Sequence, residues 1–432
     1  MMNLKEIKQI LVDQRQELKD SFKNKKIIER EFLSEYKKLL ASGLIKIITG
    51  PRRSGKSVLG YQLLADKSFA YVNFDDERLA YLKTGELNLV LEAIYETFQK
   101  PDFILLDEIQ NILGWELFLN RLKRIGFNLI VTGSNARMLG RELATHLTGR
   151  HFALELYPFS FREYLDFHNL DYQKKYFTTQ ETASIKRHLD NYLLSGGFPE
   201  VVQGEDYKKY LTSLYSTILS KDIVLRYKLK YFNTLREFAS YLVSNFSRKV
   251  TFNKLKNIFS LKSVHTAKNY FSFLYEVYLI FQIERFSYKP KERLTAPRKI
   301  YTVDTGMINA ISTKFSQEKG YLYENVVAVE LIRRKFWRSR DEIYYWQDNN
   351  HYETDFLIKD GTGVQQLIQV CYNLEDYDTK KREIFSLLKA SEKTKCHRLL
   401  VITSDYEGEE KIKGKKIKFI PCWKWLLGKD KE

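Results

Sequence analysis

Cysteine is scarce in this chain of 432 residues, and no cysteine motif is present. The three cysteines are Cys371, Cys396 and Cys422. They have no C-x-x-C spacing, and their odd number does not suit a framework of paired disulfides, which indicates a reducing compartment. Long apolar runs are missing too, and the first residues lack the apolar core of a signal peptide. We therefore expect a cytoplasmic protein that does not enter a membrane.

Acidic side chains are too few to balance the basic ones, because 54 of them face 71 lysines and arginines and leave a net charge of +17. This excess favours a polyanionic partner, with nucleic acid as the first candidate and an anionic membrane surface as the second. Many soluble proteins are basic without such a partner, so charge alone does not decide. Low-complexity segments and repeats are absent, and the length suits roughly two to four folded domains.

Residues 50–57 read Gly-Pro-Arg-Arg-Ser-Gly-Lys-Ser and match the phosphate-binding pattern G-x-x-x-x-G-K-[ST]. An apolar run at 44–49 precedes them and a helical pattern follows, so the context is strand, glycine loop, helix. The glycines let backbone N–H groups wrap phosphates, Lys56 would reach the β- and γ-phosphate oxygens, and Ser57 would ligate Mg²⁺. The expected ATP-binding residues are Gly50, Pro51, Arg52, Arg53, Ser54, Gly55, Lys56, Ser57 and Val58.

A second acidic strand is expected where four apolar residues, 103–106, end in Asp107 and Glu108. In a hydrolytic site Asp107 would help to hold the magnesium ion, and Glu108 would orient and deprotonate the attacking water. The alternative is a pair of acids that caps a helix.

A third strand, at 128–132, ends in a polar tip at the edge where open α/β sheets bind their ligands. Asn135, or failing that Ser134, is a candidate for contact with the γ-phosphate or the water, and a plain turn residue is the alternative. Arg150 is a candidate finger to the γ-phosphate of a neighbouring subunit, with Arg137 and Arg141 as rivals. An interfacial or surface arginine would look the same in the sequence.

Several segments together resemble the prokaryotic AAA+ ATPases that are often described as archaeal-type ATPases. They are Gly50 to Ser57, Asn73-Phe74-Asp75-Asp76-Glu77, Leu106-Asp107-Glu108, Thr132-Gly133-Ser134-Asn135-Ala136, and Gly149-Arg150 followed by Leu156-Tyr157-Pro158-Phe159-Ser160-Phe161-Arg162-Glu163. The resemblance covers nearly the whole chain. It implies an α/β P-loop ATPase core, a helical lid, a winged helix, and a C-terminal domain similar to the PD-(D/E)XK restriction-endonuclease fold.

The pattern along the chain fits four segments. Strands and helices alternate in a core at 1–156 with a doubly wound parallel sheet, and helices dominate a lid at 157–228. In that lid, the Gly196-Gly197-Phe198-Pro199 turn is either a nucleotide-sensing contact or only a helix stop. A winged helix is assigned to 229–304 and the nuclease-like domain to 305–432.

The winged-helix segment has helix-turn-helix spacing followed by a basic hairpin. On the second helix, three side chains face away from the apolar stripe and are candidates for a DNA groove. In the hairpin, basic side chains are candidates for phosphate contacts. The groove candidates are His265, Lys268 and Asn269, and the phosphate candidates are Lys289, Lys291, Arg293, Arg298 and Lys299. The alternative is a packing or protein-contact module.

The nuclease-like segment carries an incomplete version of the expected metal centre. Glu324 and Asp355 match its helix acid and strand acid, but Gln369 and Cys371 stand where a carboxylate and a lysine belong. An amide is a weaker ligand for Mg²⁺ than a carboxylate, and a thiol does not supply a fixed positive charge. Two helical lysines, Lys380 and Lys381, are candidates to replace that charge, or they form a solvated face.

These observations predict a Mg²⁺-dependent ATPase that acts on or near DNA as a homo-oligomer, such as a hexamer. A nucleotide-gated switch that assembles a signalling or defence complex with slow turnover is the alternative from another class. An ATP-regulated DNA nuclease is the third reading.

Overall fold

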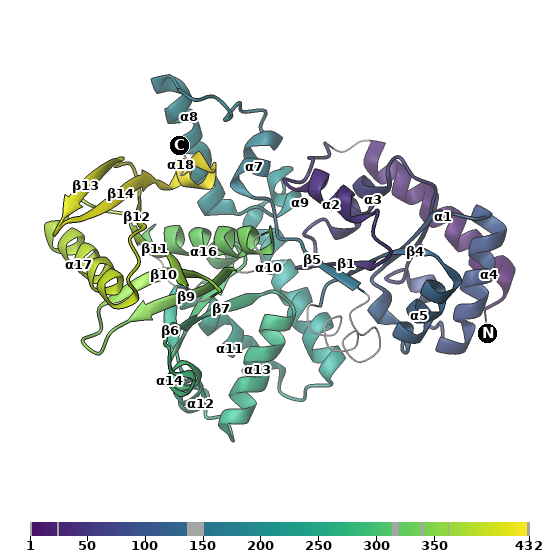
Figure 1. The fold of residues 1–432 in the computed structure, drawn as a ribbon. Helices are drawn as coiled ribbons and strands as arrows, with labels where there is room; N and C mark the ends of the chain where they lie inside the picture. Colours follow the sequence, from purple (N-terminus) through teal and green to yellow (C-terminus); the bar gives the residue numbers. More distant parts are fainter. Residues whose placement is uncertain are drawn as a thin grey trace. The chain divides into compact units, whose positions relative to one another are not determined.

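The computed structural model describes residues 2–23, 26–135, 151–312, 319–337, 341–361 and 363–429. It divides into two compact units, one formed by residues 1–158 with 276–278 and the other by 159–275 with 279–432 (Figure 1). The predicted lid, winged-helix and nuclease-like segments thus lie, apart from a few residues, in one unit.

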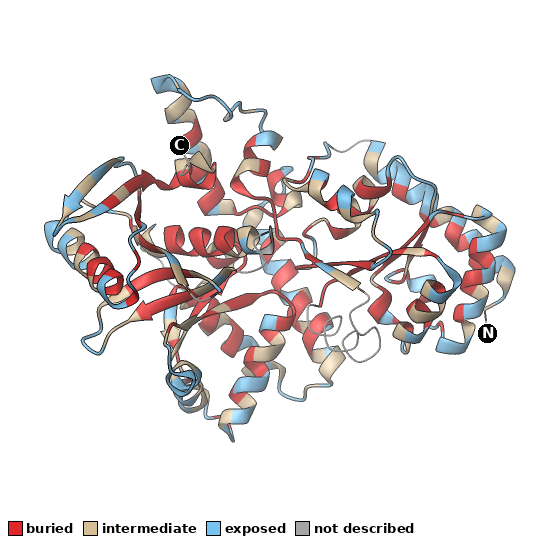
Figure 2. Cartoon of the chain, in the orientation of Figure 1, coloured by how far each residue is buried: buried red, intermediate tan, exposed pale blue. Residues whose placement is uncertain are grey.

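The first unit is built on a five-stranded parallel sheet with the order β2-β3-β4-β1-β5. Its strands are β1 (Ile45–Thr49), β2 (Phe69–Asn73), β3 (Phe103–Asp107), β4 (Asn128–Gly133) and β5 (His151–Glu155), close to the predicted ranges. Nearly every residue of β1, β3 and β4 is buried (Figure 2), which explains their continuous apolar sequences. The predicted doubly wound sheet is confirmed.

Helices supply the apolar surfaces that pack with this sheet. Leucine, isoleucine and phenylalanine from the helices join the strands in one buried core. The helical elements of this unit are α1 (Leu4–Lys23), α2 (Leu33–Leu39), α3 (Lys56–Leu64), η1 (Glu77–Leu79), η2 (Thr84–Glu86), α4 (Leu87–Phe98), η3 (Ile109–Asn111) and α5 (Trp115–Ile125).

The sheet order fixes where the three predicted motifs meet. Strand β4 lies between β1 and β3, and all three run in the same direction. The residues that follow these strands therefore share one edge of the sheet, as parallel strands require.

The second unit begins with helices α7 (Phe161–Phe167), α8 (Thr179–Ser195), α9 (Pro199–Val202), α10 (Tyr207–Thr217) and η4 (Ile218–Leu225). Helix α8 ends at Gly196, which has a φ of 78° and is buried. The next amide, Gly197 N, donates to the buried carboxylate of Asp304 at 2.7 Å. The Gly-Gly turn is thus a helix stop packed in the interior of this unit.

Residues 229–304 fold in the order helix, strand, helix, helix, strand, strand. The elements are α11 (Phe232–Ser244), β6 (Arg248–Val250), α12 (Phe252–Ile258), α13 (Val264–Glu276), β7 (Ile280–Arg285) and β8 (Arg298–Thr302). The predicted helix pair and the antiparallel strand pair are present. A short helix, α14 (Pro290–Thr295), lies in the connection between the two strands of the predicted hairpin.

The remaining elements are helices and strands of the second unit, and their strands extend the sheet that contains β6, β7 and β8. They are α15 (Thr305–Ile311), α16 (Lys319–Trp337), β9 (Asp341–Gln347), β10 (Glu353–Asp360), β11 (Gly363–Cys371), α17 (Tyr377–Thr394), β12 (Leu399–Thr403), β13 (Gly408–Ile412), β14 (Lys415–Pro421) and α18 (Cys422–Leu426). Strand β7 pairs with β9, so one nine-stranded sheet, β13-β14-β12-β11-β10-β9-β7-β8-β6, continues across the predicted boundary at residue 304.

Two further sequence expectations concern membranes and cysteines. In the part of the chain that the structure describes, no helix has the length and apolar character needed to cross a bilayer. Cys371, Cys396 and Cys422 are buried free thiols.

We expect Gly306→Ala to destabilise the second unit, because a Cβ at this position in α15 would lie 2.1 Å from the carbonyl oxygen of Ser195. Overpacking of this kind costs about 1–3 kcal/mol. The matched control is Gly320→Ala in α16, whose Cβ would meet only Tyr372 Cβ at 3.8 Å. Both variants gain helix propensity. Thermal unfolding should show a lower Tm for Gly306→Ala alone, and equal Tm values would contradict this packing.

Candidate functional site

The loop after β1 has the backbone shape of a phosphate cradle. Gly50 and Gly55 have φ values of 149° and 91°, in the region that favours glycine. A Cβ on Gly50 would lie only 2.0 Å from the carbonyl oxygen of Leu156. Gly55 directly precedes α3, so the loop leads into a helix N-terminus. The sequence predicts both features.

The remaining loop residues surround this cradle. Ser54 N donates to Pro51 O at 3.2 Å, both residues are buried, and Val58 is half-buried in α3. Arg53 is exposed with a φ of 68°, and Arg52 Nη1 lies 3.6 Å from Asp75 Oδ2. The Asp75 segment resembles the ATPase family in sequence, and this ion pair brings it to the loop.

Lys56 lies across the loop that it follows. Its ammonium donates to Gly50 O at 3.3 Å and Pro51 O at 2.9 Å, and its side chain is 4% exposed. The same nitrogen is 3.7 Å from Glu108 Oε1. This distance brings together two motifs that are about fifty residues apart in the sequence.

Asp107, the last residue of β3, is buried among hydroxyl groups. Its Oδ1 accepts a hydrogen bond from the Thr132 hydroxyl, and its Oδ2 accepts one from the Tyr71 hydroxyl at 3.0 Å. The Ser57 hydroxyl also bonds this carboxylate. Burial, followed by the charge of Glu108, raises the pKa of Asp107 above its ordinary value. A cation beside Asp107 would therefore relieve an electrostatic cost.

Tyr71 and Thr132 were not predicted from the sequence. Both lie on the strands that flank β3, and Leu105, two residues before Asp107, pairs with Tyr71. The sequence does show a hydroxyl residue near the end of each of these two strands. This pattern could have pointed to Asp107 only if the order of the strands had been known.

Glu108 is held by donors from two neighbouring segments. Its Oε2 accepts from Ser134 N at 3.3 Å, from Ser134 Oγ at 3.1 Å, and from the amide of Gln110. Burial would raise the pKa of Glu108, but the charge of Lys56 and these donors hold it below its ordinary value. Glu108 is therefore an ionised carboxylate at neutral pH.

Of the two candidates after β4, it is Ser134 that contacts Glu108. Asn135 is fully buried at the end of the same strand. Arg150 and its rivals Arg137 and Arg141 lie outside the described residues.

Arg30 was not predicted and contacts the phosphate loop directly. Its guanidinium donates to Ser54 O at 3.1 Å through Nη1 and to Tyr157 O at 2.6 Å through Nη2. Because its side chain is almost completely buried, Arg30 joins the loop to the segment after β5. A single arginine in a charged helical region gives no sequence signal for this role.

A residue far along the sequence forms a second contact with the base of the phosphate loop. Residues 276–278, at and directly after the end of α13, belong to the first unit. Tyr278 donates its hydroxyl hydrogen to Thr49 Oγ1 at 2.8 Å, and Thr49 Oγ1 donates to Leu154 O at 3.3 Å. Thr49 directly precedes Gly50.

The predicted groove residues are exposed on α13, namely His265, Lys268 and Asn269. Lys291 is exposed on α14, and Lys289 is exposed at its N-cap, where its ammonium lies 3.1 Å from Glu292 Oε1. Arg293 is half-buried and donates to the Tyr344 hydroxyl at 3.2 Å. Residues 229–304 hold 14 basic against 5 acidic side chains, so they carry about half of the chain's net charge of +17.

Two phosphate candidates of the hairpin need correction. Arg298 is half-buried and lies 3.6 Å from Glu284 Oε1, so it is already paired with an acid. The prediction for Lys299 is wrong, because its side chain is only 3% exposed and its ammonium points into carboxylates of the same unit. Its place in strand β8, with a face turned to the interior, is the reason.

The four nuclease-like residues form a cluster around Asp355. The Gln369 amide donates to Asp355 Oδ2 at 2.9 Å, and Glu324 shares a lysine partner with Asp355. Cys371 lies on the same strand as Gln369, and burial raises its pKa to about 12, so it remains a thiol. The lysine partner is Lys299.

The two helical lysines do not reach this cluster. The Lys380 ammonium is paired with Glu410 Oε1 at 2.9 Å, and Lys381 lies over the ring of Tyr377. Lys299, Glu353 and Glu383 are the members that sequence reasoning missed.

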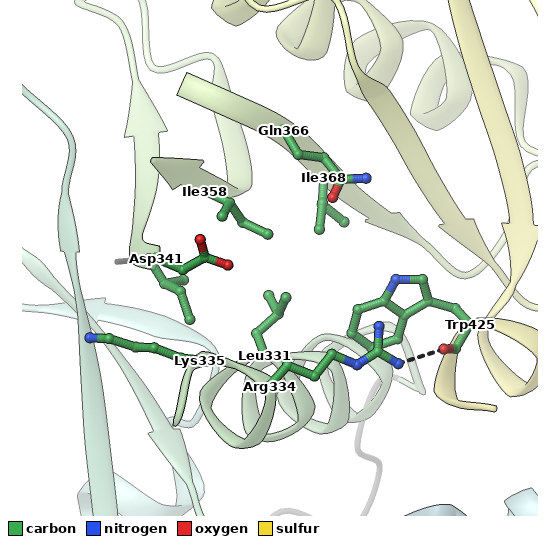
Figure 3. Close-up of a pocket in the computed structure, with 9 residues that line it drawn as sticks. Leu331, Arg334, Lys335, Asp341, Ile358, Gln366, Ile368 and Trp425 are labelled. Carbon is green, nitrogen blue, oxygen red and sulfur yellow. Dashed lines mark hydrogen bonds between the residues drawn. The ribbon is translucent and has the colours of Figure 1, made fainter. Parts of the chain in front are cut away.

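A small hollow in the second unit lies between α16, β9 to β11 and α18 (Figure 3). Arg334 stacks on Trp425 with its guanidinium carbon 4.2 Å from the ring centroid, and its Nη2 donates to Trp425 O. The hollow measures about 20 Å³, which is room for one water molecule. It is too small for a nucleotide.

Comparison with known proteins agrees with the site of the first unit. Residues 42–165 match an AAA domain family, residues 186–318 a domain of unknown function (DUF8612), and residues 319–425 another domain of unknown function (DUF4143). The solved Walker-type ATPase of Pyrococcus abyssi is 16% identical, with a TM-score of 0.44, over 66% of this chain and 96% of that chain.

Two relatives match over nearly the full length. An uncharacterized protein of Methanocaldococcus jannaschii is 36% identical over 94% of this chain and 92% of its own. An uncharacterized protein of Haemophilus influenzae is 27% identical over 93% of this chain and 99% of its own. The chain therefore belongs to the family of the Methanocaldococcus jannaschii protein, and it carries an AAA domain that contains the phosphate-binding loop.

Proposed function

We propose that the first unit binds and hydrolyses ATP with Mg²⁺ at the edge formed by β1, β3 and β4. The observation that carries this proposal is the convergence of Lys56 with Glu108 and of Ser57 with Asp107. One pair supplies a counter-charge for phosphate and a base for water. The other pair supplies oxygen donors for a metal ion.

The donor set around Asp107 suits magnesium. Mg²⁺ prefers oxygen ligands and keeps several of its waters, so a hydroxyl and one carboxylate beside the triphosphate are sufficient. Ser57 would ligate the ion, and Asp107 would hold it in place. When bound, the ion would neutralise charge on the β- and γ-phosphates.

Glu108 is the proposed base for the attacking water, and Ser134 is proposed to orient it. A carboxylate that is ionised and held by two donors of Ser134 is suited to accept a proton at a fixed place. Lys56 would leave its loop carbonyls and bind the β- and γ-phosphate oxygens.

We further propose that residues 229–304 form a winged helix that binds DNA. The concentration of basic side chains in this segment and the exposure of His265, Lys268 and Asn269 on α13 support this role. Action as a homo-oligomer, with Arg150 as a finger from a neighbouring subunit, is proposed from the resemblance to AAA+ ATPases.

The Tyr278 hydrogen bond supports coupling between the two activities. It joins Thr49, at the base of the phosphate loop, to the residues that end α13. A shift of the loop on ATP binding would therefore be transmitted to the helix proposed to contact DNA. By linkage, DNA would change ATP affinity by the same factor.

Lys56→Ala should abolish ATP binding, whereas Glu108→Gln should bind ATP and lose hydrolysis. The first change removes the counter-charge for phosphate, and the second removes only the base. Equilibrium ATP binding and steady-state turnover separate the two. Lys67→Ala and Glu92→Gln change exposed residues of the same unit and serve as controls. Hydrolysis at the wild-type rate by Glu108→Gln would overturn the assignment of β3.

Neutralising Lys268, Lys289 and Lys291 should weaken DNA binding and flatten its dependence on salt. Each phosphate contact that is lost reduces the slope of log K against log [salt] by about 0.9, so up to about 2.7 for the triple variant. Three exposed lysines of the first unit, Lys5, Lys67 and Lys100, provide the matched control. If the slope of log K against log [salt] is unchanged in the triple variant, these three lysines do not contact DNA phosphates, and the proposed binding surface is wrong.

Tyr278→Phe should uncouple ATP from DNA, because it deletes only the hydroxyl that donates to Thr49. We expect the ratio of DNA affinities with and without ATP to fall to within about twofold of unity. Tyr231→Phe, which changes an exposed tyrosine, is the control. A ratio equal to that of the wild type would show that the coupling takes another route. DNA binding that is absent from every variant would instead overturn the winged-helix proposal.

A further inference from the structure

The most completely paired charge cluster of the described residues surrounds Lys299 in the second unit. The lysine extends from β8, and its ammonium lies 2.7 Å from Glu324 Oε1, 2.6 Å from Glu353 Oε1 and 2.8 Å from Asp355 Oδ1. An ammonium group has three donors, and each of them has a carboxylate oxygen within hydrogen-bond distance. One buried cation thus joins strand β8 to helix α16 and strand β10.

Each of these carboxylates has a further donor, which for Glu324 approaches the same oxygen as Lys299. Tyr301 donates to Glu324 Oε1 at 2.6 Å, and Lys249 donates to Glu353 Oε2 at 2.5 Å. Asp355 Oδ2 accepts from Val370 N and from the Gln369 amide, both at 2.9 Å. Each of the three carboxylates thus has at least two donors from the chain.

A metal ion does not fit this arrangement. In the nuclease fold that the domain resembles, a helix acid and a strand acid converge on a divalent cation, and here the convergence point holds Lys299 Nζ. Gln369 turns its NH₂ group toward Asp355 and toward Glu383 Oε2 at 2.6 Å, so the amide acts as a donor and not as a ligand.

The pKa of Lys299 agrees with this geometry, whereas burial raises the pKa of Glu324 to about 8 and raises the pKa of Asp355 above its ordinary value. Burial would lower the pKa of Lys299, but the charges of Asp355, Glu324 and Glu353 outweigh it and hold the pKa well above its ordinary value. Lys299 is therefore a permanent ammonium at any physiological pH. Buried carboxylates require a partner of opposite charge, which this lysine supplies.

We propose that the ammonium of Lys299 takes the place of the divalent cation in the nuclease-like centre. The domain then needs no metal to fold and has no metal with which to activate water for phosphodiester cleavage. The lysine also fixes β8 of the proposed winged helix to α16 and β10, so the C-terminal domain acts as a rigid support for the winged-helix segment. This inference is independent of the proposed ATPase and DNA activities.

The test measures Mn²⁺ binding by the full chain without nucleotide. Binding is monitored as the loss of the EPR signal of free Mn²⁺. The wild type and Asp355→Asn should take up the same amount of Mn²⁺, which would show that no uptake by the wild type depends on Asp355. Lys299→Ala leaves three carboxylates around an open space and should take up about one Mn²⁺ ion more per chain. Adding Asp355→Asn to Lys299→Ala should abolish that uptake. Lys393→Ala, which removes an exposed lysine of α17, is the matched control.

Thermal unfolding gives a second readout. The Tm of Lys299→Ala should be well below that of the wild type in EDTA and should rise with Mn²⁺, because a ligand of the folded state stabilises it. The Tm of the wild type should be the same in EDTA and in Mn²⁺. If Lys299→Ala does not fold in EDTA, refolding in Mn²⁺ replaces this comparison.

Three results would overturn the proposal. The first is Asp355-dependent Mn²⁺ uptake by the wild type, since a metal would then displace the lysine. The second is a Lys299→Ala variant that gains neither Mn²⁺ nor stability from it, including one that fails to fold in Mn²⁺. The third is nicking of plasmid DNA by the wild type with Mn²⁺ that disappears in Asp355→Ala.

Discussion

The approach of the Lys56 ammonium to the Glu108 carboxylate, at 3.7 Å, is the interaction on which the nucleotide-binding unit depends. It joins the phosphate loop to the strand that carries the acids, and it lowers the pKa of Glu108 against the opposing effect of desolvation. The strand order makes this approach possible, because β4 alone separates β1 from β3. The hydroxyls of Tyr71 and Thr132 complete the same edge by supporting Asp107.

The second unit shows the same physical rule with a different outcome. Carboxylates are buried in both units, and each set lies beside one lysine. Lys56 has carbonyl partners and one distant carboxylate, so it is free to exchange them for phosphate. Lys299 has three carboxylate contacts of 2.6 to 2.8 Å, so it is a permanent part of its site. One lysine is thus suited to a ligand, and the other replaces one.

The features that the sequence predicted are those whose signal is local. The loop at 50–57, the strand that ends in Asp107, and the helix pair α12 and α13 each follow from a short run of residues. Lys299 was misplaced because its partners lie on α16 and β10, and only the pairing of β7 with β9 shows that β8 and β10 share a sheet. Arg30 and Tyr278 were missed for the same reason, since their contacts with Ser54 and Thr49 cross large sequence separations.

The central claim is that ATP turnover at the Lys56–Glu108 edge responds to DNA. The most direct test is the steady-state rate of ATP hydrolysis with and without duplex DNA, together with the mass of the protein in each nucleotide state. We predict a severalfold higher rate with DNA, and no hydrolysis in either condition for Glu108→Gln. An ATP hydrolysis rate that is unchanged by DNA, together with an assembly mass that changes with the bound nucleotide, would contradict the claim. That result would indicate a nucleotide-gated assembly switch.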